Sequence, residues 1–204
     1  MSSQFHVAEE SWGHHYKVIA SDGEGGKRHF FIENSPYTPK KPDLIIHDGT
    51  EIDGPTIGLA KFRRFTSNCD IRLDGAGEWM SLAKKGVVAP SYTFQIPLHG
   101  QMTHLAWKKT RSMGSFYGPY GNHKLVDEQS QDVLAVFSSN GDSLVTGHLD
   151  MYGDYGESFD RMALLTALAV RERSRRQTTR SARVGHENVY TTGACGAGAG
   201  GGAC

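Results

Sequence analysis

The sequence predicts one mostly β domain that buries a single apolar helix and is followed by a disordered tail. Three observations carry this prediction. Apolar and polar residues alternate along much of residues 16–149, residues 162–170 are almost entirely apolar, and the chain after residue 176 is polar and then rich in glycine. At 204 residues the chain is long enough to bury a core without metal or disulfide support.

The strands are predicted from a period of two. In residues 69–73 and 92–98, apolar side chains alternate with polar ones, which is typical of strands with one face on the core. The dipeptide Asn140-Gly141 predicts a tight hairpin. About ten short strands at this spacing indicate a sandwich or a barrel. The less regular runs that predict the other strands are residues 28–33, 43–47, 56–60, 78–82, 101–107, 123–127, 133–137 and 143–149.

The helix is predicted from a change of period. Eight of the nine residues in the stretch 162–170 are apolar, and most are strong helix formers. Ser158 is placed to act as the N-cap. A helix that is apolar all round is surrounded by protein or by lipid. This one is too short to span a membrane, so we expect it to lie inside the β structure with Leu164, Leu165 and Leu168 buried.

These elements divide the chain into three parts. We expect an N-terminal extension at residues 1–15, the β domain at residues 16–175 with its helix at about 158–175, and a disordered tail at residues 176–204. The tail is rich in arginine at first and contains only Gly, Ala and Cys from residue 193 onward, a composition that cannot offset the entropy of ordering. Without a signal peptide or a disulfide framework, a reducing, cytoplasmic compartment is expected.

No catalytic residues, cofactor or metal site are expected. The ten histidines are scattered and lack the short spacings of zinc ligands. Neither a nucleophile motif nor a phosphate-binding loop occurs, so the sequence predicts a protein that is not an enzyme. Asp150, Asp154 and Glu157 resemble a calcium loop, but their spacing departs from the EF-hand pattern and favours an acidic capping loop.

Charge is unevenly distributed, although the formal net charge is zero. Residues 159–204 contain seven arginines and three acidic residues, so the rest of the chain is acidic in balance, which argues against nucleic acid as a partner. Three short basic clusters, at residues 61–64, 84–85 and 108–111, are interpreted as solvated strand ends. Residues 171–183 hold six arginines and one glutamate, a composition that favours contact with an anionic membrane or phosphate groups. The candidate contact residues are Arg171, Arg173, Arg175, Arg176, Arg180 and Arg183.

The three cysteines have different expected roles. Cys69 lies in an alternating run and is expected to point into the core as a small apolar side chain. Cys195 and Cys204 lie in the glycine-rich tail and are candidate acylation sites. One acyl chain beside a polybasic stretch would supply the two signals that stable membrane anchoring needs.

The order of the elements resembles the tubby C-terminal-like superfamily, which includes tubby domains, LURP-one-related proteins and phospholipid scramblases. The segments that carry the resemblance are Lys124–Glu128, Val133–Phe137, Ser143–Gly147 and Ser158–Val170, and they look like a small fungal branch of that group. The resemblance covers roughly residues 16–175 and implies a closed antiparallel β-barrel around a central apolar helix. It also implies, from tubby domains, binding of phosphoinositide headgroups, without assigning that role to any residue of this chain.

Two functional hypotheses follow. The first is a non-enzymatic intracellular module that associates weakly, through its basic tail, with anionic phospholipid at a membrane surface or with an unidentified protein partner. The second is a β-barrel that binds a small ligand at its mouth, where barrels commonly place such sites. Neither hypothesis includes a cofactor or a transmembrane segment.

Overall fold

The structure, a computed structural model, describes residues 3–10, 14–21, 26–35, 38, 40–73, 77–87, 90–110, 122–139 and 146–192, without the side chains of Thr146 and of residues 180–192. Within these residues the chain forms twelve strands followed by one helix. The strands are β1 (Gln4–Glu9), β2 (Tyr16–Ser21), β3 (Lys27–Asn34), β4 (Leu44–Asp48), β5 (Thr56–Phe62), β6 (Cys69–Leu73), β7 (Met80–Lys85), β8 (Ser91–Leu98), β9 (Gln101–Thr110), β10 (Asn122–Asp127), β11 (Val133–Ser139) and β12 (Thr146–Met151), and the helix is α1 (Glu157–Thr192).

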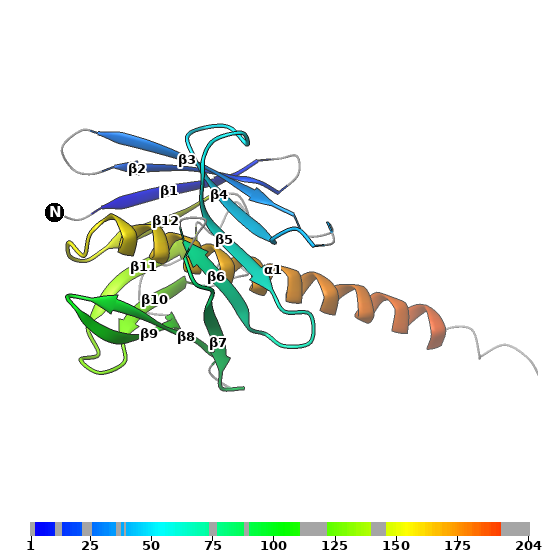
Figure 1. Cartoon of the computed structure of the whole chain (residues 1–204). Helices are drawn as coiled ribbons and strands as arrows, with labels where there is room; N and C mark the ends of the chain where they lie inside the picture. Colours follow the sequence, from blue (N-terminus) through cyan, green and yellow to red (C-terminus); the bar gives the residue numbers. More distant parts are fainter. Residues whose placement is uncertain are drawn as a thin grey trace, which may run out of the picture.

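The strands form one closed barrel in which each strand pairs antiparallel with its neighbours in sequence (Figure 1). β1 closes the ring, because Phe5 lies opposite Leu149 of β12 on one side and Ala20 of β2 on the other. This confirms the predicted fold class, a mostly β domain closed around a C-terminal helix.

The barrel has two distinct ends. Because neighbouring strands run in opposite directions, all odd-numbered strands start at the same end of the barrel and finish at the opposite end, and the even-numbered strands run the other way. Arg28, at the start of β3, contacts Glu157 at the start of α1, and Asn34, at the end of β3, contacts Arg176 farther along the helix. The helix therefore runs through the barrel in the same sense as the odd strands. We call the end where α1 begins the entry mouth and the end where it leaves the exit rim.

The helix supplies the centre of the core. Leu164, Leu165 and Leu168 are 1%, 0% and 1% exposed, which confirms their predicted burial. A Cβ atom on Gly58 of β5 would lie only 3.1 Å from Cδ2 of Leu165, so a glycine at this position lets the helix pack closely against the barrel wall.

The predicted strands are confirmed, since each predicted run overlaps one of the strands β3 to β12. Cys69 and Ile71 are 2% and 0% exposed, as their alternation with polar residues predicted. The dipeptide Asn140-Gly141 lies outside the described residues, but the strands that flank it, β11 and β12, pair antiparallel.

The barrel begins earlier in the chain than the sequence suggested. Residues 4–9, placed in an N-terminal extension, instead form β1 and complete the ring. Phe5 and Val7 face the core and are 3% and 2% exposed, whereas His6 and Ala8 face solvent. An alternation carried by only two large apolar residues is too short to stand out from the background of the sequence.

The helix also differs from the prediction at both ends. It begins at Glu157, and the backbone carbonyl of Gly156 accepts the amide of Phe159 at 3.0 Å, so Gly156 rather than Ser158 occupies the N-cap position. The helix then continues to Thr192 through residues that were assigned to the tail. The Gly-Ala-Cys segment, residues 193–204, lies outside the described residues.

Ion pairs at residues 172–176 explain why the helix continues beyond its apolar stretch. Arg175 Nε and Arg176 Nε donate to Glu172, three and four residues earlier, at 2.7 and 2.6 Å. Such spacings place side chains on the same face of a helix, so these ion pairs stabilise helical backbone beyond the apolar stretch.

Candidate functional site

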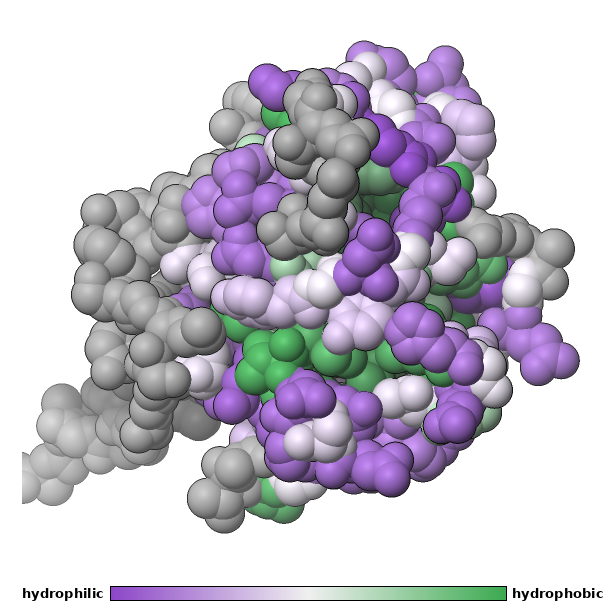
Figure 2. Space-filling model, turned by 90° about the vertical axis from the view of Figure 1, so that its left-hand side faces the viewer, coloured by the Kyte–Doolittle hydropathy of each residue, from purple (hydrophilic) through white to green (hydrophobic). Residues whose placement is uncertain are grey.

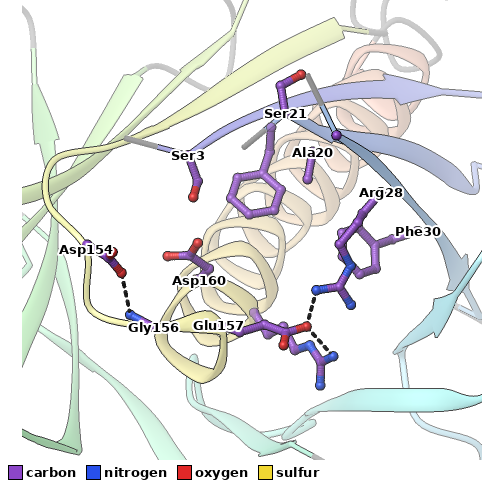
Figure 3. Close-up of a pocket in the computed structure, with 12 residues that line it drawn as sticks. Ser3, Ala20, Ser21, Arg28, Phe30, Asp154, Gly156, Glu157 and Asp160 are labelled. Atoms are coloured by element: carbon purple, nitrogen blue, oxygen red, sulfur yellow. Dashed lines mark hydrogen bonds and ion pairs between the residues drawn. The ribbon is translucent and has the colours of Figure 1, made fainter. Parts of the chain in front are cut away.

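A pocket of about 230 Å³ opens at the entry mouth. Its walls come from β1, β2 and β3 on one side and from the first turns of α1 on the other (Figure 3). Figure 2 looks at this end of the molecule, where hydrophobic side chains are visible between hydrophilic ones. The chain therefore offers a concave site at the mouth of the barrel.

The pocket has an apolar wall. The rings of Phe5 and Phe30 lie with their centroids 6.4 Å apart, and each side chain is 3% exposed. Ala20, which pairs with Phe5 across β1 and β2, lines the same wall. These residues lie on the core face of their strands, so the pocket is an extension of the hydrophobic core toward solvent.

Two arginines on the pocket share one carboxylate. Arg28 of β3 and Arg161 of α1 both donate to Oε1 of Glu157, the latter at 2.5 Å. The hydrogen bond from Arg28, followed by the charges of both arginines, lowers the pKa of Glu157 and keeps it ionised. Arg28 also lies 3.8 Å from Asp48 and over the ring of Phe30. Both guanidinium groups are therefore occupied.

Asp160, in contrast to Glu157, is a carboxylate whose pKa is raised. It projects from α1 into the pocket, toward the same space as the hydroxyl of Ser3 (Figure 3). Burial is the main cause that raises its pKa, and the neighbouring carboxylates of Asp154 and Glu157 raise it further, against a hydrogen bond from Ser3 that lowers it. The described part of the chain shows no basic side chain in an ion pair with Asp160.

A second hollow of about 320 Å³ lies at the same end, around Tyr155. Oδ1 of Asp127, on this hollow, accepts the backbone amide of Gln129 at 2.7 Å and so forms part of a turn. Polar side chains line most of the hollow, whereas the pocket has the apolar wall of Phe5, Ala20 and Phe30, so the pocket is the stronger candidate site.

The described residues bear on two kinds of reactive group, a metal-binding cluster and a free thiol. They contain no group of three or more His, Cys, Asp or Glu placed to hold a metal ion. Cys69, their one free thiol, is in the core, and burial raises its pKa, so it is a poor nucleophile. Within the same residues, no helix is both long enough and apolar enough to cross a membrane.

Two of the predicted arginines, Arg171 and Arg175, contact carboxylates of the protein itself. Arg171 is 2% exposed and lies 3.7 Å from Glu9 of β1. Arg175 pairs with Glu172, which is 0% exposed. Along the sequence this stretch looks like uncompensated positive charge. In the fold, Glu9 of the barrel wall and Glu172 of the helix compensate part of that charge.

The other two described arginines are also engaged at the exit rim. Arg173 donates to the backbone carbonyl of Arg63 at 3.1 Å and lies over the ring of Phe62. Arg176 pairs with Asp43 and donates to Oδ1 of Asn34 at 2.9 Å. The side chains of Arg180 and Arg183, and the candidate acylation sites Cys195 and Cys204, lie outside the part that the structure describes.

Comparisons with known proteins identify no relative. No family model matches the chain, and neither a curated protein nor a solved structure matches it. The site is therefore interpreted from its own geometry.

Sequence reasoning missed most of the pocket. Asp154 and Glu157 were noticed as an acidic loop, but Arg28, Asp160 and Phe5 were not singled out. The available signal was Asp160 itself, an acidic residue two positions before the apolar stretch of a buried helix. A carboxylate so close to a buried segment indicates either a helix end or a site.

Proposed function

We propose that this protein is a non-enzymatic binding module whose entry-mouth pocket takes a small molecule with an apolar body and a protonated amine. The observation that carries the proposal is Asp160, a half-buried carboxylate that makes no ion pair within the described residues and lies near two further carboxylates, those of Asp154 and Glu157. An ammonium group would compensate that charge, and the apolar body of the ligand would cover Phe5 and Phe30.

An anionic ligand fits less well. Arg28 and Arg161 could attract one, but both already share the carboxylate of Glu157, which an anion would have to displace. The charged side chains on the pocket are these two arginines and the carboxylates of Asp154, Glu157 and Asp160, so the balance is negative. Charge complementarity therefore favours a cation.

Size restricts the ligand further. Pockets for drug-sized molecules are typically about 300–1,000 Å³. At about 230 Å³ this pocket suits a smaller molecule, such as an amine that carries a single aromatic ring.

A barrel closed around one apolar helix also supports the hypothesis that the chain is related to the tubby C-terminal-like superfamily. On that hypothesis the module works by binding.

Three matched probes test the proposal: 2-phenylethylamine, 2-phenylethanol and phenylacetate, titrated into the protein and followed by NMR chemical shifts. We expect the amine to bind most tightly and to shift residues of the entry mouth. Asp160→Asn should weaken amine binding by about tenfold or more, because a hydrogen bond to a charged group contributes about 1.5–3 kcal/mol. Asp132→Asn, in the neighbouring hollow, is the control and should leave binding unchanged.

Binding should also depend on pH. Asp160 binds the amine only when it is ionised, and its pKa is raised, so affinity should fall as the pH drops through that raised value. Preferential binding of phenylacetate would contradict the proposed charge, and failure of all three probes to bind would contradict the pocket.

A further inference from the structure

The described residues of the three short basic clusters, 61–64, 84–85 and 108–109, lie toward one end of the barrel. They lie at the ends of β5, β7 and β9, and all odd strands end at the exit rim. Lys84 of β7 also donates its backbone amide to Oδ1 of Asn68, in the loop after β5, at 3.1 Å. Ser91, which follows the β7–β8 loop, pairs with Lys108 of β9. The ends of β5, β7 and β9 therefore lie close together, although the ammonium group of Lys108 is turned toward Gln131 of the β10–β11 loop.

The exit rim carries two fully exposed apolar side chains at adjacent loop tips. Phe65, in the β5–β6 loop, is 98% exposed, and Val87, in the β7–β8 loop, is 96% exposed. Figure 1 shows the β5–β6 loop on the side where α1 leaves the barrel. Exposed apolar side chains that are grouped rather than scattered are typical of a contact surface.

The β5–β6 loop is held in this position by α1. Arg173 donates to the backbone carbonyls of Arg63 and Thr66, on either side of the exposed phenylalanine. Arg63 in turn makes a two-nitrogen contact with Asp70 at 2.7 and 3.1 Å. Because the backbone is anchored at Arg63 and Thr66, the Phe65 side chain between them is held exposed to solvent.

The charge around these tips is positive and uncompensated. Lys61, Arg64, Lys84 and Lys109 make no ion pair within the described residues, and Lys85 has only a distant one, 4.0 Å from Glu128. Three acidic residues of the exit rim are paired with arginines: Glu9 with Arg171, Asp43 with Arg176 and Asp70 with Arg63.

We infer that the exit rim is a docking surface for an anionic lipid bilayer, with Phe65 and Val87 inserted among the acyl chains and the basic side chains on the headgroups. Exposed apolar tips ringed by cations have the complementarity of a membrane interface, which is apolar below and negatively charged above. The surface is independent of the entry-mouth pocket, which lies at the opposite end of the barrel.

The test is co-sedimentation of the full chain with phosphatidylcholine vesicles, with and without phosphatidylserine. We expect binding only to the vesicles that contain phosphatidylserine, and weaker binding as salt is raised. Phe65→Ser should lower the affinity about tenfold or more, the loss expected for a buried aromatic side chain. Phe65→Leu should retain most of the binding, because leucine is also apolar. Lys84→Gln/Lys85→Gln should lower the affinity by a similar factor.

The matched control is Met102→Ser, which removes a side chain that is 60% exposed in the β8–β9 hairpin at the entry mouth. It should leave vesicle binding unchanged. Lys27→Gln, at the start of β3, is the corresponding charge control. Circular dichroism checks that every variant is folded. The inference is overturned if the wild type does not bind anionic vesicles, if Phe65→Ser binds as well as the wild type, or if Met102→Ser weakens binding equally.

Discussion

Glu172 offers the sharpest test of what holds α1 in the barrel at the exit rim. Its carboxylate is 0% exposed and accepts the hydroxyl of Tyr16 at 2.9 Å. It also accepts both Arg175 Nε and Arg175 Nη2 at 2.7 Å, and Arg176 Nε at 2.6 Å. Glu172→Gln removes the charge and keeps the size. Two guanidinium groups that are only 16% and 17% exposed would then lose their shared anion.

The expected loss of unfolding free energy is about 3 kcal/mol or more, since breaking a buried ion pair typically costs about 3–5 kcal/mol. Glu157→Gln is the matched control, because Glu157 also holds two arginines but its side chain is 53% exposed. A pair in contact with water contributes at most about 1 kcal/mol. Urea unfolding, followed by tryptophan fluorescence, measures both variants.

The same residue makes a prediction about pH. Burial alone would raise the pKa of Glu172, but the hydrogen bonds and charges of Arg175 and Arg176 outweigh it and lower the pKa. A lowered pKa in the folded state means that the stabilisation is present above the unfolded value of about 4.3 and is lost as the pH falls through the folded value. The acid-induced loss of stability should therefore be smaller in Glu172→Gln. If the variant is as stable as the control and has the same acid profile as the wild type, the network does not hold the helix.

Three further changes test other parts of the core. Leu165→Ala should lower the unfolding free energy by about 2–5 kcal/mol in urea titrations, because it opens a cavity at the centre of the barrel. Thr166→Val should cost about 1–3 kcal/mol, since it leaves the buried indole N–H of Trp107 without its acceptor at 2.9 Å, whereas Thr166→Ser should not. Cys69 should react with a maleimide only after denaturation, because the thiol is buried and its pKa is raised; peptide mapping that finds Cys69 itself rapidly labelled in the native protein would refute this placement.

The strands were predictable because their signal is local. Cys69 and Ile71 show the period of two within a single strand, and the apolar stretch of α1 shows its burial without reference to any partner. β1 carries the same signal in only two residues, Phe5 and Val7, and its place in the fold depends on closure against β12 at the other end of the chain. Closure is a long-range property, and a single sequence does not display it.

The pocket could not be predicted for the same reason. Its apolar wall comes from β1 to β3, and its carboxylates come from the start of α1. Asp160 becomes part of a pocket only when the barrel closes around the helix and brings Phe5 and Phe30 beside it.

Charge shows most clearly what the linear sequence conceals. Read along the chain, the arginines at residues 171–176 look like a basic tail, and the clusters at the ends of β5, β7 and β9 look like scattered surface charge. The antiparallel topology changes both interpretations, that of the helical arginines and that of the strand-end clusters. It brings Glu9 and Asp43 to the helical arginines and neutralises them, and it places the ends of β5, β7 and β9 on a single rim. A reading of local charge therefore points to the segment whose cations are already paired. Among the described residues, Lys61, Arg64, Lys84 and Lys109 on the barrel rim are cations without an ion pair.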